Sequence, residues 1–492
     1  MTWTQITLAI IGSLCVLCSY WHWKTAVYGL VLWDAARDPL RKLFPEYQIP
    51  LVMLGLCLWL ACLLGCLRKS HCGMRPDIPM RSLKWGGLCL GAFLVIALIA
   101  AVRHSVPANV MSLGMISYLF PLVVFPIGVY FGSNVDEMTR WVWLYCLVHG
   151  LLLTTAVMEV SGFKSPVIGG IMMEWFRFRG DISIPLPSGV YRSPDILGLH
   201  AAHVSAMGVL LVLQANRRPG KLLAAMVTVF SCVMLVFSAR RKMLGLFLSF
   251  LLTFIALQWC SGSSARLRLG LNRFTALGSS LIVLVIFGSL LLVPIRAQTE
   301  YALTVITELP QRLWISLLAS PLATYQQTGF WGTGLGSATQ GNFVVATGFD
   351  SGWQEDGIGR LVREGGVPGA VLAIIGIGGF VWSLRCKKPM GTNDGQAFTQ
   401  TARAAEQSAF HPCRVLPGKE YDSMTVGASV VTAGVLKSED VWKDGFWALV
   451  MANLFCLVIS HQHLSGDPVF GALLSFMAGM SVKNSRKTID HV

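Results

Sequence analysis

Charged residues are scarce in this chain: they make up 13% of its 492 residues, whereas hydrophobic residues make up 54%. Soluble domains usually carry about 25% charged residues, and a single hydrophobic core stops growing near about 250–300 residues. The shortage of charge therefore excludes a disordered chain, a fibrous protein and most soluble enzymes. It indicates a membrane protein with several spans.

Signatures of several enzyme classes are also missing. The sequence contains no nucleophile elbow, no zinc signature and no Walker motif. Most of its thirteen cysteines lie inside apolar runs, where cysteine usually behaves as a small hydrophobic residue. Their spacings match neither a disulfide framework nor a zinc knuckle. No cleavable signal peptide is evident, because no basic segment precedes the first apolar run.

About twelve apolar segments are long enough to cross a bilayer, which requires about 20 mostly apolar residues. They lie near 4–21, 50–67, 85–102, 112–132, 141–160, 194–214, 221–238, 243–260, 274–295, 366–384, 441–460 and 467–482. Residues 24–46 form either a span or an interfacial or re-entrant segment, and the sequence does not decide between these because the apolar stretch before Asp34 is short. The expected fold is an all-α polytopic membrane protein.

Basic loops set the expected orientation. Five of them lie at 68–84, 217–221, 266–273, 385–388 and 483–487. Strict alternation of the spans places all five on one side, which the positive-inside rule identifies as the cytoplasm. Both termini are then cytoplasmic, and only the N-terminus changes side if residues 24–46 cross. Almost all of the net charge of +14 falls on this side, so the charge does not indicate a nucleic-acid partner.

The topology divides the chain into four parts. These are the N-terminal spans (1–160), a core (161–385) with outer loops at 161–193 and 296–365, a cytoplasmic insert (386–440), and a last pair of spans with a tail (441–492). The longer outer loop precedes the tenth span. The insert is rich in Gly, Ser, Thr and Gln, a composition typical of flexible segments.

Three cations break the topology rule, because Arg240, Arg241 and Lys242 occupy a tight turn on the outer side. They indicate either a miscounted span or a cationic site for an anionic ligand in the outer leaflet. Other outer cations are Lys164, Arg177, Arg179, Arg192, Arg296 and Arg312. Arginine presents a rigid fork of donors that suits phosphate oxygens, so several converging arginines would suit a pyrophosphate. For any single arginine, a salt bridge or a headgroup contact is the commoner role.

The segment 355–369 closes the longer outer loop and combines Glu355 and Asp356 with Arg360 and Arg363. A carboxylate beside several arginines is either a general base or a salt-bridge partner, and the sequence alone favours the structural role.

Other polar patterns favour packing over chemistry. The Gly-Thr-Gly-Leu-Gly run at 332–336 lacks the strand-turn-helix context of a phosphate loop, so it predicts a tight loop. His200 and His203 have no carboxylate nearby in sequence, which favours buried bundle residues over metal ligands. His461, His463 and Asp467 predict a polar turn. The sequence therefore predicts no metal site.

Four segments carry a family resemblance. They are 191–199, 238–245, the pair 311–314 with 329–336, and 355–369. In this order they resemble motifs of the O-antigen polymerase and O-antigen ligase family of bacterial membrane glycosyltransferases, and residues 38–45 resemble a segment near the start of some polymerase-like members. The resemblance covers roughly residues 160–385. It implies a C-type membrane glycosyltransferase in the bacterial inner membrane. Such an enzyme transfers glycan from an undecaprenyl-pyrophosphate-linked donor at the outer face, without a metal or another cofactor.

One departure from the family pattern bears on function. Ligase-type members usually carry a His-Asn pair where this chain has Glu355-Asp356. The difference favours a polymerase-like member and makes Glu355 the candidate for the role of that His. The resemblance then implies a catalytic set of Glu355, Arg312, Arg192 and Arg240. It implies substrate binding by Arg241, Lys242, Arg177, Arg179, Arg360 and Arg363. Expected partners are the lipid-linked oligosaccharide, membrane lipids, and a chain-length regulator or other assembly protein.

Three alternatives stay open. A ligase would move finished glycan onto a lipid acceptor. A transporter or flippase would move lipid-linked sugar, although the sequence shows no internal symmetry of the kind common in transporters. A C-type enzyme that uses a polyprenyl-phosphate sugar would need an early outer Asp, which Asp34 or Asp38 could supply.

Overall fold

The computed structural model describes residues 3–70, 80–163, 165–169, 176–179, 182–215, 217–260, 296–339, 356–385, 438–459 and 468–482. Its helices are α1 (Trp3–Trp21), α2 (Trp23–Leu43), α3 (Gln48–Ser70), α4 (Met80–Arg103), α5 (Ala108–Phe131), α6 (Val135–Val160), α7 (Pro194–Gln214), α8 (Arg218–Phe237), α9 (Arg241–Cys260), α11 (Arg296–Trp314), α12 (Ser320–Thr328), α14 (Gly357–Arg385), α16 (Ser438–Ile459) and α17 (Pro468–Met480). Short 3-10 and π segments, η1 (Pro45–Tyr47) and η3 (Ile315–Ala319), join some of them. The strands β1 (Phe176–Arg179) and β2 (Ile182–Pro185) form an antiparallel hairpin.

The expected all-α membrane architecture is confirmed. Within the described ranges, nine helices are long and apolar enough to cross a membrane, and two shorter apolar helices cover Ile10–Trp21 and Gly471–Met480. Every expected span has a helix at its place, except 274–295, which lies outside the described residues together with the insert and its surroundings at 386–437.

The segment that the sequence left open runs alongside a span. Gly55 of α3 lies against Trp33 of α2, and Gly65, further along α3, lies against Trp23. The later residue of α3 lies against the earlier residue of α2, so the two helices are antiparallel, and α2 lies along much of α3. The charged residues of α2 that are buried, Arg37 and Asp38, are therefore placed at or near membrane depth.

The course of α2 changes the expected position of the N-terminus. Gly12 of α1 lies against Leu54, and Tyr20 lies against Gly65, so α1 runs parallel to α3. The guanidinium of Arg68, in the first basic loop, lies over the Tyr20 ring at 4.8 Å. The start of α1 therefore lies at the end of the bundle opposite to the basic loops. Because α2 runs back along α3, the structure favours the alternative in which the N-terminus lies away from the basic loops. The side of the membrane that each terminus faces stays a prediction.

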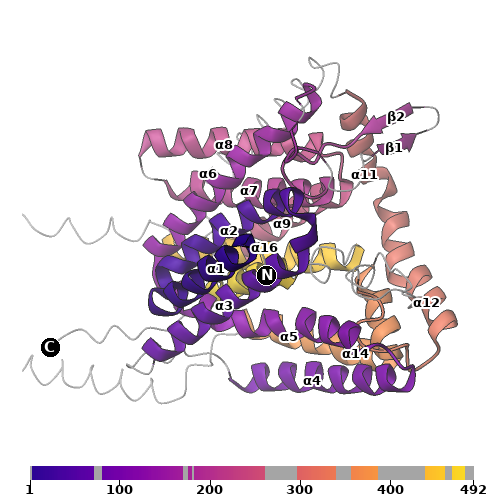
Figure 1. The fold of residues 1–492 in the computed structure, drawn as a ribbon. Coiled ribbons are helices and arrows are strands. Elements are labelled where there is room, and N and C mark those ends of the chain that lie inside the picture. Colours follow the sequence, from indigo (N-terminus) through magenta and orange to yellow (C-terminus); the bar gives the residue numbers. More distant parts are fainter. Residues whose placement is uncertain are drawn as a thin grey trace, which may run out of the picture.

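The helix α7 forms the centre of the bundle, since 83% of its span is buried. It packs against α6, α8, α9 and α16, and these helices lie together in Figure 1. A second group of close pairs joins α4 to α14 and α5 to α17. Small residues permit this close packing: a Cβ atom on Gly128 of α5 would lie 2.0 Å from the carbonyl oxygen of Phe476 in α17.

The helices α11 and α12 follow one another along the right edge of Figure 1, from the β1–β2 hairpin to α14. They contact α8, α9 and α14 near the ends that lie away from the basic loops. The helix α14 begins at Gly357, before the expected span, and breaks at Gly366, whose φ of 65° is left-handed. Gly366 is needed there because a Cβ atom would lie 2.1 Å from the Phe330 carbonyl oxygen.

The close contact between α5 and α17 can be tested with a matched pair of glycines. Gly128→Ala should lower the free energy of unfolding by roughly 1–3 kcal/mol, because the added methyl group meets backbone of α17. Gly91→Ala in α4 meets nothing within 4 Å, so it should be neutral or slightly stabilising. Thermal unfolding of the purified variants in detergent measures both. Equal effects would contradict the packing described above.

The position of the N-terminus can be tested by tagging. An epitope before Trp3 should be reached by a protease added to spheroplasts, whose outer membrane has been opened, because α1 starts at the end away from the basic loops. An epitope after Val482 should be reached only after the spheroplasts are lysed. Protection of both tags would show that α2 does not cross the membrane.

Candidate functional site

The turn between α8 and α9 presents the three cations that break the topology rule. The turn is short because Ala239 adopts a left-handed φ of 49°, and the Arg240 amide donates to the Ser238 hydroxyl. Asp195, in the first turn of α7, pairs with Arg240 (Nε–Oδ1 3.3 Å) and with Lys242 (Nζ–Oδ1 3.0 Å). One carboxylate therefore holds two cations, and Arg240 is buried at 7% exposure.

The third cation joins α9 to α11. Arg241 donates to the Thr304 hydroxyl at 2.8 Å, forms an ion pair with Glu308, and lies over the Tyr301 ring at 4.5 Å. Arg312, one turn further along α11, also approaches Glu308 (Nε–Oε2 4.0 Å) and is half exposed. Partial burial acts to raise the pKa of Glu308, but the hydrogen bond and charge of Arg241 outweigh it and hold this pKa below its usual range. Glu308 is therefore an ionised partner of both arginines.

We call Asp195, Arg240, Arg241, Lys242, Glu308 and Arg312 the outer cationic cluster. It contains four of the cations that the sequence selected, and α7, α9 and α11 bring them to one end of the bundle. Its two carboxylates, Asp195 and Glu308, were not among the selected residues. Asp195 could have been found from its place in the 191–199 motif, whereas nothing in the sequence distinguishes Glu308.

Of the other residues predicted for the site, the structure describes the surroundings of Arg192 but not the side chains of Arg177, Arg179 or Glu355. Arg192 is half-buried just before α7, and its backbone amide donates to Asp38 Oδ2 at 3.1 Å. Arg177 and Arg179 lie on β1, opposite Ile184 and Ile182, but their side chains are outside the described part of the chain. Glu355, the expected base, also lies outside it.

Arg360 belongs to a separate buried cluster at the start of α14. Its Nε pairs with Glu364 at 3.1 Å, an Nη donates to the Thr339 hydroxyl at 3.0 Å, and the guanidinium lies over the Tyr118 ring at 4.9 Å. Arg360 is 2% exposed and Glu364 is fully buried. These contacts hold Arg360 within the protein, and its expected contact with substrate stays a prediction.

The neighbouring residues of this segment also hold backbone in place. Arg363 is buried, and its carbonyl oxygen accepts a hydrogen bond from the Thr333 amide at 2.7 Å. Asp356 caps α14 by accepting hydrogen bonds from the Ser320 hydroxyl and the Gly359 amide. The glycines at 332, 334 and 336 all have left-handed φ and pack against backbone, which confirms the prediction of a tight loop.

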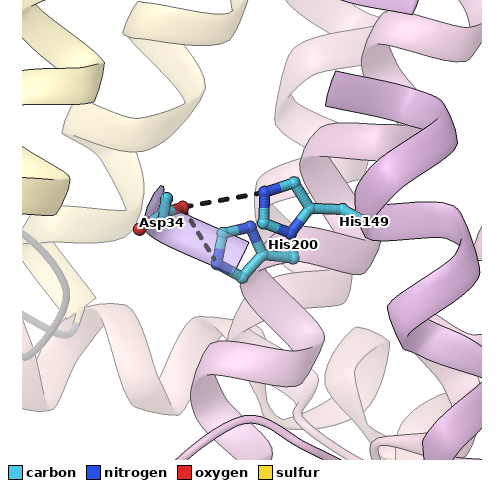
Figure 2. A group of neighbouring side chains, drawn as sticks. All are labelled: Asp34, His149 and His200. Atoms are coloured by element: carbon cyan, nitrogen blue, oxygen red, sulfur yellow. Dashed lines mark ion pairs between the residues drawn. The ribbon is translucent and has the colours of Figure 1, made fainter. Parts of the chain in front are cut away.

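A second polar centre was missed by the sequence analysis. Asp34 of α2 faces His149 of α6 and His200 of α7 (Figure 2), and its Oδ2 lies 3.7 Å from Nε2 of each ring. Each ring also contacts a tyrosine through its other nitrogen. The Tyr191 hydroxyl lies 3.1 Å from Nδ1 of His149, and the Tyr145 hydroxyl lies 2.8 Å from Nδ1 of His200. We call Asp34, His149 and His200 the Asp34 centre.

Both histidines of α7 are buried in the bundle, as expected. His203 is a bundle residue, as expected, since its ring bonds the Asn453 side chain at about 3.1–3.2 Å. His200 has a carboxylate beside it after all. The carboxylate comes from α2, far away in sequence, and the packing of α2 into the bundle brings Asp34 to His200.

A ladder of charges joins the Asp34 centre to the outer end of α2. Arg37 pairs with Asp34 at 3.3 Å and with Asp38 at 3.7 Å, and Arg41 pairs with Asp38 at 3.7 Å. Lys42 then donates to the carbonyl oxygens of Val167 (3.2 Å) and Gly189 (2.8 Å) in the outer loop. The ladder therefore holds the loop before α7 against α2.

The dependence of the outer cationic cluster on Asp195 can be tested. Asp195→Asn leaves Arg240 and Lys242 without their shared carboxylate, and breaking a buried pair usually costs about 3–5 kcal/mol. Glu308→Gln removes a carboxylate that is 38% exposed, so its loss should cost about 0.2–1 kcal/mol. Thermal unfolding should therefore place Asp195→Asn well below Glu308→Gln. The reverse order would show that Asp195 is not the main partner.

No family model, curated protein or solved structure matches this chain.

Proposed function

We propose that this chain is a polysaccharide polymerase of the bacterial inner membrane. It would transfer undecaprenyl-pyrophosphate-linked glycan onto a lipid-linked repeat unit at the outer face. The observation that carries the proposal is the meeting of Arg241 and Arg312 at one partly exposed carboxylate, Glu308, next to Arg240 and Lys242, which share Asp195. Cations gathered at the end of the bundle away from the basic loops suit an anionic lipid group.

The proposed reaction needs positive charge where the leaving group forms. The bond between the anomeric carbon and the donor oxygen breaks, and its electron pair goes to the polyprenyl pyrophosphate. Arg241 and Arg312 would stabilise that charge, with pyrophosphate oxygens taking the place of the Glu308 carboxylate. Because arginines supply the charge, this step requires no metal ion at the pyrophosphate.

The acceptor sugar must lose a proton as its hydroxyl oxygen bonds to the anomeric carbon. A carboxylate at the end of the longer outer loop is the proposed acceptor of that proton. Glu355 is our candidate, since its neighbour Asp356 already caps α14. Arg192 would lie at the same end of the bundle, because its segment leads into α7 and Asp195. A chain-length regulator is the proposed protein partner.

Arg312 gives the most direct test of this function in cells. Arg312→Ala should abolish long polymer while the protein still inserts, because the side chain is half exposed and its ion pair with Glu308 is long, at 4.0 Å. Loss of one such charge-stabilising group typically slows transfer about 10²–10³-fold. Arg103→Ala is the matched control, since Arg103 is an exposed arginine at the same end of the bundle. Polymer length is read from a gel of the extracted glycan.

The pattern of products separates the alternatives. Single repeat units in the Arg312→Ala strain support a polymerase. Long polymer that is not attached to its acceptor would instead indicate a ligase. Lipid-linked repeat units retained on the cytoplasmic side would indicate a transporter, and polymer of normal length would rule out a role for Arg312.

A further inference from the structure

The Asp34 centre brings three groups that can bind a metal ion close together. Oδ2 of Asp34 lies 3.7 Å from Nε2 of His149 and 3.7 Å from Nε2 of His200, and all three atoms lie within 4.8 Å of one another. Hydrogen bonds from nitrogen to oxygen are about 2.7–3.2 Å long. The three atoms therefore face one another across a gap that is too wide for direct hydrogen bonds, from three different helices (Figure 2).

The surrounding groups leave these three atoms directed inward. The Tyr191 and Tyr145 hydroxyls lie within hydrogen-bond distance of the Nδ1 atoms of His149 and His200. When each Nδ1–H donates to its tyrosine oxygen, each Nε2 carries a lone pair toward the gap. Arg37 pairs with the other oxygen of Asp34, Oδ1, at 3.3 Å. Metal-binding histidines and carboxylates are usually supported by such outer hydrogen bonds and ion pairs.

We propose that Asp34, His149 and His200 bind one divalent transition-metal ion, for which Zn²⁺ is the probe. Zinc binds imidazole nitrogen and carboxylate oxygen at about 2.0–2.2 Å, so two ligands on a tetrahedral ion are separated by about 3.4 Å. The two distances of 3.7 Å are close to this value. Two nitrogens and one oxygen suit zinc and its neighbours better than magnesium or calcium, which prefer oxygen ligands.

A proton in place of the ion would leave a different geometry. One proton can join Asp34 to only one imidazole, and it would draw that pair to hydrogen-bond distance and leave the other pair longer. The two distances are instead equal. The rings of His149 and His200 are stacked, with their centroids 4.1 Å apart and their planes within 7° of parallel. An ion lies near the plane of each imidazole that ligates it, and one ion cannot lie in two separate parallel planes. Binding therefore turns the two rings apart.

The ion would join α2, α6 and α7, the helices that carry its three ligands. Asp34 and Tyr145 also border a small cavity of about 10 Å³, which is close to the volume needed for one water molecule. Such a water could complete a tetrahedral set. The site would fix a charged helix within the membrane bundle, and it is independent of the proposed transfer at the outer cationic cluster.

Metal content of the purified full-length chain tests the proposal. After the protein is stripped with a chelator and supplied with Zn²⁺, mass spectrometry should find one tightly held zinc per chain, and Mg²⁺ should not compete. Asp34→Asn, His149→Gln and His200→Gln should each weaken zinc binding at least about tenfold. Two matched controls should keep it: Asp38→Asn, one turn away on α2, and His203→Gln, one turn away on α7.

The visible absorption of bound Co²⁺ tests the site in the wild-type chain, so this test does not depend on variants that fold poorly. Co²⁺ added to the stripped wild-type chain should give the visible absorption of a tetrahedral site, and Zn²⁺ should displace it and raise the unfolding temperature. Wild-type protein that binds no zinc, or gives no cobalt spectrum, would overturn the proposal. So would controls that lose zinc as fully as the three ligand variants, because the ion would then lie elsewhere in the chain.

Discussion

The structure depends on one constraint: a charge placed within a membrane bundle must be paired. An unpaired charge at the centre of a bilayer is costly, so charged side chains there face other helices and one another. The helix α2 meets this requirement with alternating charges, from Asp34 through Arg37 and Asp38 to Arg41. Each acidic group pairs with a neighbouring arginine, and this pairing lets a helix of low hydrophobicity lie among apolar ones.

The same constraint organises the outer end of the bundle. Asp195 holds Arg240 and Lys242 together, and Glu308 holds Arg241 and Arg312 together. The two carboxylates differ in burial, since Glu308 is 38% exposed and Asp195 is 13% exposed. The pairs of Asp195 therefore fix the turn between α8 and α9, whereas the pairs of Glu308 are the more exposed. The proposed pyrophosphate site uses this difference.

The positions of the apolar helices were predicted correctly from hydropathy. The apolar helices lie at their expected places within the described ranges, because a span is defined by a long local run of apolar residues. The course of α2 remained open, because its charges lower its hydropathy, and its contacts with α6 and α7 come from residues far away in sequence. For the same reason Asp34 was not connected to His149 and His200. The buried cluster around Arg360 was not predicted either, because its partners Tyr118 and Thr339 lie far away in sequence.

Reconstitution tests the central claim most directly. The purified chain, placed in lipid vesicles with a synthetic polyprenyl-pyrophosphate-linked repeat unit on the outer side, should need no nucleotide. The account predicts a ladder of glycans that grow by whole repeat units, with one polyprenyl pyrophosphate released for each unit added. A folded, inserted chain that leaves the repeat unit at its original length would contradict the account.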